Sequence, residues 1–228
     1  SVSVGAVLES LDHVYDATEL LAELQAAKEY DGQKWKSLFD GKELGKWQSS
    51  AFGTDGPLEV LDGEISIGMG DPLSGITWQG NFPRDNYEIS LEAKRVEGFD
   101  FFCGLTFPVG EDACSFILGG WGGGLVGLSS IDGLDASEND TNAYMELEDK
   151  RWYEIIVRVN PKAITVLLDG KELIEQERAG REISIRPEMF MCEPLGVATY
   201  ATASRLRNLH YRLLDDENQQ QDTSDVTP

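Results

Sequence analysis

A β-hairpin is predicted most clearly by residues 151–170, which read Arg151-Trp-Tyr-Glu-Ile-Ile-Val-Arg-Val159, then Asn160-Pro-Lys-Ala163, then Ile164-Thr-Val-Leu-Leu-Asp-Gly170. β-branched residues dominate both runs, and Asn160-Pro161 is a turn signal. Alternate side chains of a strand point to opposite faces of its sheet. One face of the hairpin is therefore expected to be apolar and to face a core, with Ile155, Val157, Val159, Ile164, Val166 and Leu168 as its members.

Runs of this type continue outward through residues 35–214, where glycine, β-branched and aromatic residues prevail. Short turn signals separate them at Asp62-Gly63, Glu97-Gly98, Val109–Asp112, Gly122–Gly124 and Asp169-Gly170. This spacing is typical of an all-β sandwich or barrel and not of alternating strands and helices. We therefore predict one β-sandwich domain over residues 35–214.

Both ends of the chain differ from this pattern. Residues 7–30 repeat apolar side chains at spacings of three and four and are rich in Ala, Glu and Leu, which predicts a helix ended by Asp31-Gly32. We take residues 1–34 as a helical extension, whose apolar stripe, with Leu11 and Leu24, packs on the domain or mediates self-association. Residues 215–228 are polar and acidic and are predicted to be a disordered tail.

The charge of the chain excludes several kinds of partner. Its 228 residues include 19 basic and 41 acidic ones, a formal net charge of −22. Nucleic acids and anionic membranes both require a positive field, so neither is expected as a partner. No run of about 18 apolar residues predicts a membrane span. The acidity itself fits either solubility or a site for a divalent cation.

Cysteine and histidine are scarce. Cys103, Cys114 and Cys192 lack metal-ligand spacing and are interpreted as small core residues, with a disulfide to Cys192 left open. With only two histidines, His13 and His210, a histidine-based metal site or a Ser-His-Asp triad is not expected.

The turns suggest how residues 87–129 pair. We predict a hairpin that places Arg95 opposite Phe99, which sets Lys94 opposite Asp100 and Glu92 opposite Phe102. A second hairpin pairs Phe107 with Cys114 and Cys103 with Leu118. A third turns at Gly122–Gly124 and sets Leu128 beside Leu118.

This register gives one sheet face an unusual composition. Three glycines weaken the strands unless something approaches the backbone closely, and an aromatic ring, carboxylates and hydroxyls surround them. Sugars bind such surfaces by stacking on the ring and by hydrogen bonds. The alternative is a solvated face with ion pairs such as Lys94–Asp100. The residues predicted to contact a sugar are Trp121, Glu88, Thr106, Ser115, Gly104 and Gly119.

The loop at residues 131–142 is dense in oxygen ligands. Asp132, Asp135 and Glu138 could hold a hard cation such as Ca²⁺, although the spacing is not that of an EF-hand. A solvated acidic loop is the other interpretation. We expect no cofactor to be required, and Ca²⁺ is the one ion that this loop could bind.

Several motifs resemble the 3-keto-disaccharide hydrolase domain family. They are Trp35-Lys-Ser-Leu-Phe-Asp-Gly-Lys-Glu-Leu-Gly-Lys-Trp47, Leu58-Glu-Val-Leu-Asp-Gly-Glu-Ile65, Asn86-Tyr-Glu-Ile-Ser-Leu-Glu-Ala-Lys94, Arg151–Val159, Val166–Gly170 and Leu206-Arg-Asn-Leu-His-Tyr-Arg-Leu213. Their order and spacing are more specific than any single motif. The resemblance implies a concanavalin A-like jelly-roll sandwich, a bacterial protein that is secreted or periplasmic, and the breakdown of saccharides.

The resemblance also implies a chemistry and its residues. A ketone at sugar C3 acidifies the C2 proton, so a base can form an enolate and the C1 oxygen can leave. Glu92 matches the Glu of the family's L-x-L-E-x-[RK] strand and is our first candidate for the acid or base. Lys94 matches the basic position and could stabilise an oxyanion, and Asp100 is the next carboxylate.

The sequence departs from the family in two strands. Members carry Gly-Ile-x-x-Arg and Tyr-Glu-x-Gln, where this chain has Gly104-Leu-Thr-Phe-Pro108 and Cys114-Ser-Phe-Ile117. Three functions follow as hypotheses. The chain is a secreted enzyme that cleaves 3-keto-glycosides, a non-catalytic carbohydrate-binding module, assisted by Ca²⁺ or not, or a laminin-G-like interaction domain.

Overall fold

The computed structural model describes residues 29–30 and 33–214, and the chain divides into two compact units, Ser1–Lys36 and Ser37–Pro228. In the first unit, β1 (Glu29–Tyr30) pairs antiparallel with β2 (Gln33–Lys34). The predicted helix is therefore wrong at residues 29–30, because Asp31-Gly32 is a dipeptide that favours a two-residue hairpin turn. The rest of that helix and the predicted tail lie outside the described residues. Strand β3 (Lys36–Ser37) contains the boundary between the units.

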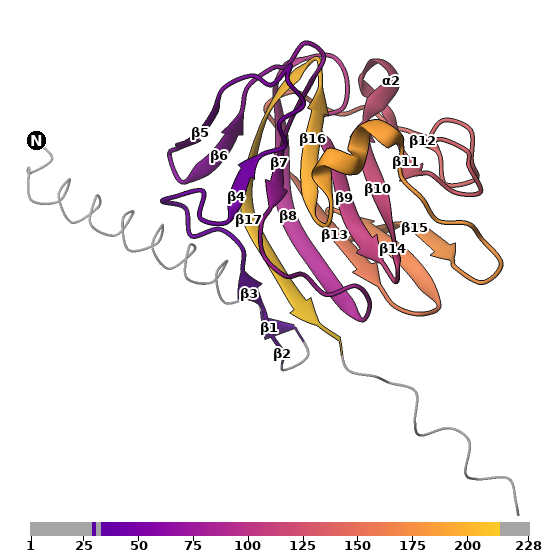
Figure 1. The fold of residues 1–228 in the computed structure, drawn as a ribbon. Coiled ribbons are helices and arrows are strands. Elements are labelled where there is room, and N and C mark those ends of the chain that lie inside the picture. The colour runs from indigo at the N-terminus through magenta and orange to yellow at the C-terminus, as the bar shows by residue number, and fades with distance from the viewer. Residues whose placement is uncertain (1–28, 31–32, 215–228) are drawn as a thin grey trace, which may run out of the picture. The chain divides into compact units, whose positions relative to one another are not determined.

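The second unit is a sandwich of two antiparallel sheets (Figure 1). The sheet that we call the β9 sheet has the order β12 (Ala143–Tyr144), β11 (Leu125–Ser129), β10 (Asp112–Gly119), β9 (Cys103–Val109), β16 (Gly196–Tyr200), β7 (Leu73–Trp78) and β4 (Trp47–Ser49). The β8 sheet follows the order β15 (Lys171–Glu177), β14 (Ala163–Leu168), β13 (Tyr153–Val159), β8 (Tyr87–Gly98), β17 (Thr202–Leu213), β6 (Glu64–Ile67) and β5 (Leu58–Leu61). The all-β sandwich is as predicted, and its finer description as a jelly roll remains a prediction.

The main core lies between the two sheets and is built by period-two alternation. Leu105 and Phe107 of β9 and Ile155 and Val157 of β13 are fully buried in one cluster. A second cluster of buried residues covers the opposite face of the β9 sheet, which is not in contact with that core. It draws side chains from β10, from β16 and from the short helix η1 (Pro187–Cys192), and its members include Phe101, Ile117, Leu125, Met189, Cys192 and Ala198. Both faces of the β9 sheet are thus packed, which accounts for strands buried along their whole length.

Predicted registers hold where the turns are short. Ile155 pairs with Leu168 and Val157 with Val166, as expected for the hairpin at residues 151–170. Phe107 pairs with Cys114, and Cys103 lies opposite Leu118. In the third hairpin the prediction is wrong by two residues, since Leu128 pairs with Phe116. The shift is even, so Leu128 still faces the core.

The predicted hairpin between residues 87–95 and 99–107 does not form. Strand β8 runs on to Gly98 and pairs with β13 and β17, whereas β9 belongs to the other sheet. Gly98 has a φ of +106°, and a side chain there would meet Thr202 of β17 at 2.6 Å. The connection at residues 98–102 is therefore a crossover between sheets and not a turn within one.

The three cysteines are free and buried, as expected for core residues. Burial raises the pKa of each thiol to about 12. Among the described residues no helix has the length and apolar character needed to cross a membrane.

Candidate functional site

A cavity of about 310 Å³ opens on the face of the β9 sheet that points away from the main core. Its lining combines acidic, basic, hydroxyl, aromatic and aliphatic side chains: Leu73, Asp100, Phe101, Ser115, Ile117, Trp121, Ser129, Asp135, Arg186, Glu188, Met189 and Tyr200. A concave site with a few convergent polar groups among apolar ones is the usual form of a ligand site.

The strand residues of the lining, which we call the floor of the cavity, include Ser115 and Ser129. Together with Thr106, which lies outside the lining, they form a row of hydroxyl residues across three neighbouring strands. Ser115 of β10 pairs with Thr106 of β9 on one side and with Ser129 of β11 on the other. The hydroxyls of Thr106 and Ser115 are 2.8 Å apart, and all three residues are almost completely buried. The row arises because Cys114 and Phe116 turn into the core, which leaves Ser115 between them on the opposite face.

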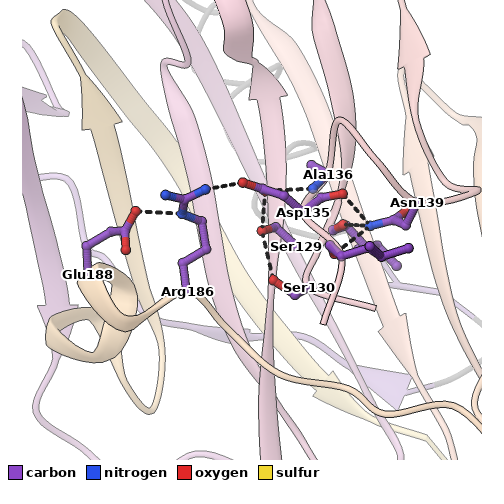
Figure 2. Close-up of polar contacts among 9 residues, drawn as sticks. Ser129, Ser130, Asp135, Ala136, Asn139, Arg186 and Glu188 are labelled. Carbon is purple, nitrogen blue, oxygen red and sulfur yellow. Dashed lines mark hydrogen bonds and ion pairs between the residues drawn. The ribbon is translucent and has the colours of Figure 1, made fainter. Parts of the chain in front are cut away.

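One wall is a chain of ionic contacts that begins at this floor (Figure 2). Asp135 Oδ1 accepts hydrogen bonds from Ser129 Oγ at 2.8 Å and from the Ala136 N–H at 2.6 Å. Asp135 Oδ2 is paired with Arg186, whose Nε donates to Glu188 Oε1 at 2.5 Å. Asp135 is thus nearly saturated with donors, and its negative charge fixes the guanidinium of Arg186.

Arg186 is held as a cation by its two carboxylate partners. Burial lowers its pKa, but the hydrogen bonds and charges of Glu188 and Asp135 outweigh that effect, and the net shift of the pKa is upward. Arg186 lies at the start of η1, where Pro187 is the first helical residue. It is a positive charge that stays in place at the cavity.

Asn139 fixes the loop that supplies Asp135. Its Nδ2 donates to the backbone carbonyls of Leu128, Leu134 and Asp135, at 2.7, 3.2 and 2.9 Å. Its Oδ1 accepts from the Thr141 N–H and hydroxyl. Figure 2 shows Asn139 beside Asp135 on the same loop. A buried amide with this many partners makes the loop a fixed part of the wall.

The lining also includes Asp100 and Trp121, and Trp121 belongs to a glycine-rich turn (Gly119–Gly124) that contains α2 (Gly120–Gly123). Asp100 Oδ1 accepts from the Phe101 N–H at 2.8 Å and Oδ2 from the Gly122 N–H at 3.1 Å. Each carboxylate oxygen therefore retains a free lone pair. Trp121, in the middle of the turn, lines the cavity with 45% of its surface exposed.

The predicted sugar-contact and catalytic residues divide between the two sheets. Asp100, Trp121 and Ser115 line the cavity together. Thr106 is bonded to Ser115, and Gly104 lies on the same sheet, opposite Ile117 and Ala198. Gly119 begins the turn that carries Trp121. The predicted register thus placed Thr106 and Ser115 correctly on the face away from the main core, and their contact with a sugar stays a prediction.

Glu88, Glu92 and Lys94 do not belong to this face, because β8 is a strand of the other sheet. Glu92 accepts hydrogen bonds from Arg207 Nε at 2.9 Å and from Asn208 Nδ2 at 2.6 Å. The predicted pairing of Lys94 with Asp100 is wrong, since Lys94 lies 3.4 Å from Glu64. The cause is the sheet crossover after Gly98.

The face that carries Glu92 is a layer of ion pairs around Trp152. Lys94 Nζ lies 4.2 Å and the Arg207 guanidinium 4.1 Å from the centroid of that ring, so cations occupy the surface on which a sugar would stack. Glu88 is buried and bonded to both Arg158 and Arg212. A catalytic role for Glu92 and Lys94 stays a prediction that rests on the resemblance alone.

Two of the three residues predicted to bind Ca²⁺, Asp132 and Asp135, have other partners. Asp132 is paired with Arg181 at 2.9 Å and accepts the Glu182 N–H at 2.8 Å, and Asp135 is paired with Arg186. Across residues 29–30 and 33–214, no three His, Cys, Asp or Glu side chains are grouped so that they could hold a metal ion. Ca²⁺ binding by Asp132, Asp135 and Glu138 remains a sequence-based prediction.

Several lining residues were not predicted from the sequence. Leu73 comes from β7, Tyr200 from β16, and Arg186, Glu188 and Met189 from the start of η1 and the residue before it. The dipeptide Arg186-Pro187 could have predicted a helix start. Nothing in the local pattern places that helix against β7 and β16, because the long-range pairing of β16 decides its position.

Comparison with known proteins identifies the family. No curated protein matches the chain. Among solved structures, a Bacillus subtilis protein with a galectin-like fold is 10% identical, with a TM-score of 0.55, and the match covers 79% of this chain and 100% of that one. The Crh5 transglycosylase in complex with NAG is 11% identical, with a TM-score of 0.53 and coverage of 77% and 82%.

An endo-acting O-glycanase from the human gut microbiota is 10% identical, with a TM-score of 0.52 and coverage of 76% and 94%. At such identities these likenesses show the fold alone. The model of the 3-keto-alpha-glucoside-1,2-lyase-like domain, in contrast, matches residues 34–210, which is most of the chain. The chain therefore belongs to the 3-keto-alpha-glucoside-1,2-lyase-like domain family.

Proposed function

We propose that the chain is an enzyme that cleaves the glycosidic bond of 3-keto-glycosides in the cavity on the β9 sheet. Membership of the family supports the reaction class. The observation that carries the location is the convergence of a carboxylate with free lone pairs, a fixed guanidinium and exposed aromatic surface in one cavity, from Asp100, Arg186 and Trp121.

In this proposal Asp100 is the base. It removes the proton from C2 of the 3-keto sugar, and the electron pair of that bond forms an enolate on the C3 oxygen. The C1–O bond then breaks as the enolate collapses, the departing oxygen takes a proton from solvent, and an enone and an alcohol result. Addition of water to the enone would complete a hydrolysis. Asp100 accepts two hydrogen bonds and has no cationic partner within the part of the chain that the structure describes, whereas Asp135 accepts three and is ion-paired with Arg186, so Asp100 is the better placed of the two to take the C2 proton.

Arg186 is the group proposed to stabilise the enolate. Its Nε and Nη1 are bonded to Glu188 and Asp135, which orient the guanidinium before substrate binds, and its remaining N–H donors can hydrogen-bond the enolate oxygen although the two carboxylates offset its charge. Trp121 and Tyr200, both partly exposed at the cavity, offer ring faces for the C–H surface of a pyranose. The hydroxyl row on the floor supplies hydrogen bonds to sugar hydroxyls.

The decisive test is product analysis with methyl 3-keto-α-glucoside, with and without EDTA. Asp100→Asn should lower kcat by at least about 100-fold, the usual contribution of a general base. Glu92→Gln should keep turnover close to that of the unchanged protein, since its carboxylate lies on the other sheet. Loss of turnover in Glu92→Gln with retention in Asp100→Asn would move the chemistry to the β8 sheet, as the family motif predicts.

A binding module is the second candidate, and a specific observation favours it. Ser115 and Ile117 occupy the floor of the cavity at positions where the family pattern has Glu and Gln. The floor therefore lacks the carboxyl group that the family pattern has at this position and that could transfer a proton. Saturable sugar binding that Trp121→Ala abolishes, without turnover of any keto substrate, would establish this alternative. We also propose that the protein is secreted and that its acidic loop binds Ca²⁺, and a loss of turnover or of sugar binding in EDTA would support the Ca²⁺ site.

A further inference from the structure

We propose that Arg95 is a positioning residue that holds the glycine-rich turn and thereby keeps Trp121 at the cavity, so that it sets the affinity of the site for saccharide. This inference rests on the proposed function. Arg95 does not line the cavity itself. Its effect on a ligand would be transmitted through the turn.

Arg95 links the two sheets at this end of the sandwich. It belongs to β8, yet its Nη2 donates to the Gly123 carbonyl of the turn at 2.7 Å. Its Nη1 lies 3.1 Å from Asp149 Oδ1, and its guanidinium lies 5.1 Å from the centroid of the Phe102 ring. Only 7% of the side chain is exposed. A buried guanidinium with these partners has little freedom to move.

The turn needs such an anchor because its backbone conformation is unusual. Trp121 has a φ of +47°, a left-handed conformation that side-chain-bearing residues seldom adopt, and Gly119, Gly122 and Gly123 also have positive φ. Residues in this region persist when their surroundings determine them. Two peptide groups of the turn are held from outside it, the one that contains the Gly123 carbonyl by Arg95 and the one that contains the Gly122 N–H by Asp100.

Gly119 shows that the turn and Arg95 fit each other closely. A Cβ at this position would lie 2.8 Å from Arg95 Nη2 and 3.1 Å from the Phe102 ring. The absence of a side chain at Gly119 therefore leaves room for the guanidinium to reach Gly123. The same glycine also permits the φ of +86° with which the turn begins.

The test compares Arg95→Met, which keeps the apolar stem and removes both polar contacts, with Arg95→Lys. Arg178→Met is the matched control. Arg178 also pairs with one carboxylate, Asp85, and with one backbone carbonyl, that of Asn160, is 17% exposed, and does not line the cavity.

Methyl α-glucoside, which lacks the ketone needed for elimination, serves as the binding probe. Arg95→Met should raise its Kd about tenfold and raise KM for the keto substrate similarly, with kcat within about twofold. Arg95→Lys should recover part of the affinity, because an ammonium can still donate to the Gly123 carbonyl. Arg178→Met should leave Kd unchanged.

A second measurement does not depend on sugar. The part of the tryptophan fluorescence that disappears in Trp121→Phe is assigned to Trp121. Iodide should quench this part more strongly in Arg95→Met than in the unchanged protein, because Trp121 becomes more accessible. An equal Kd in Arg95→Met, or an equal rise in Arg178→Met, would overturn the inference. If the unchanged protein neither binds nor cleaves sugar, the proposed function fails, and unchanged Trp121 quenching would then show separately that Arg95 does not position the turn.

Discussion

At the scale of single residues, three cysteine thiols and one tyrosine hydroxyl are buried and lose their protons only at high pH. They make the stability of the fold depend on pH in the alkaline range. Burial raises the pKa of Cys103, Cys114 and Cys192 from 9.0 to about 12, and burial and the charge of Asp85 raise that of Tyr87 well above its ordinary value. Between pH 9 and 12 the unfolded chain has lost these protons while the folded chain retains them. Stability must then fall as pH rises.

We expect the free energy of unfolding to be insensitive to these groups below pH 9 and to decline steadily above it. Urea unfolding between pH 7 and pH 11 checks this. A thiol reagent at pH 8 should react with the three cysteines only after unfolding, because they are buried and protonated. Rapid labelling of the folded protein, or a free energy of unfolding that is flat to pH 11, would contradict the prediction.

At the scale of the element, the wall of the cavity depends on one amide. Asn139→Ala removes the amide that donates to the carbonyls of Leu128, Leu134 and Asp135, of which those of Leu134 and Asp135 keep backbone donors. We expect a loss of about 1–3 kcal/mol in the free energy of unfolding. Asn142→Ala is the control, since Asn142 Nδ2 donates to the Asn139 carbonyl alone. Urea unfolding measures both variants. An equal loss of unfolding free energy in Asn139→Ala and Asn142→Ala would show that Asn139 stabilises the loop no more than Asn142 does.

Also at this scale, sequence-based pairing was correct in register only for hairpins whose two strands lie in one sheet. The hairpins at β9–β10 and β13–β14 were predicted in register because a few turn residues fix which side chains oppose each other. The link between β8 and β9 was misread because a crossover and a hairpin can start from the same Glu-Gly dipeptide. That single error separates Glu92 and Lys94 from Asp100.

At the scale of the whole molecule, charge should govern which sugars enter. Three carboxylates and one guanidinium line the cavity, and Arg186 is already paired with two of those carboxylates. The chain carries a net charge of −22. We therefore expect methyl α-glucuronide to bind at least about tenfold more weakly than methyl α-glucoside, with a smaller difference at high salt. Calorimetric titration of both ligands at two salt concentrations checks this, and equal affinities would contradict it.

The sequence alone determined the all-β sandwich, the core positions of its clearest hairpins and the sheet face that carries Ser115 and Thr106, because alternation and turn chemistry act over a few residues. The order of the motifs in the sequence also showed the resemblance to the family, which the match of the family model confirms. Only the tertiary structure decided which strands share a sheet, and hence that Asp100, Trp121, Asp135 and Arg186 surround one cavity. These residues come from distant segments, and their meeting depends on long-range pairing of strands that no local pattern specifies.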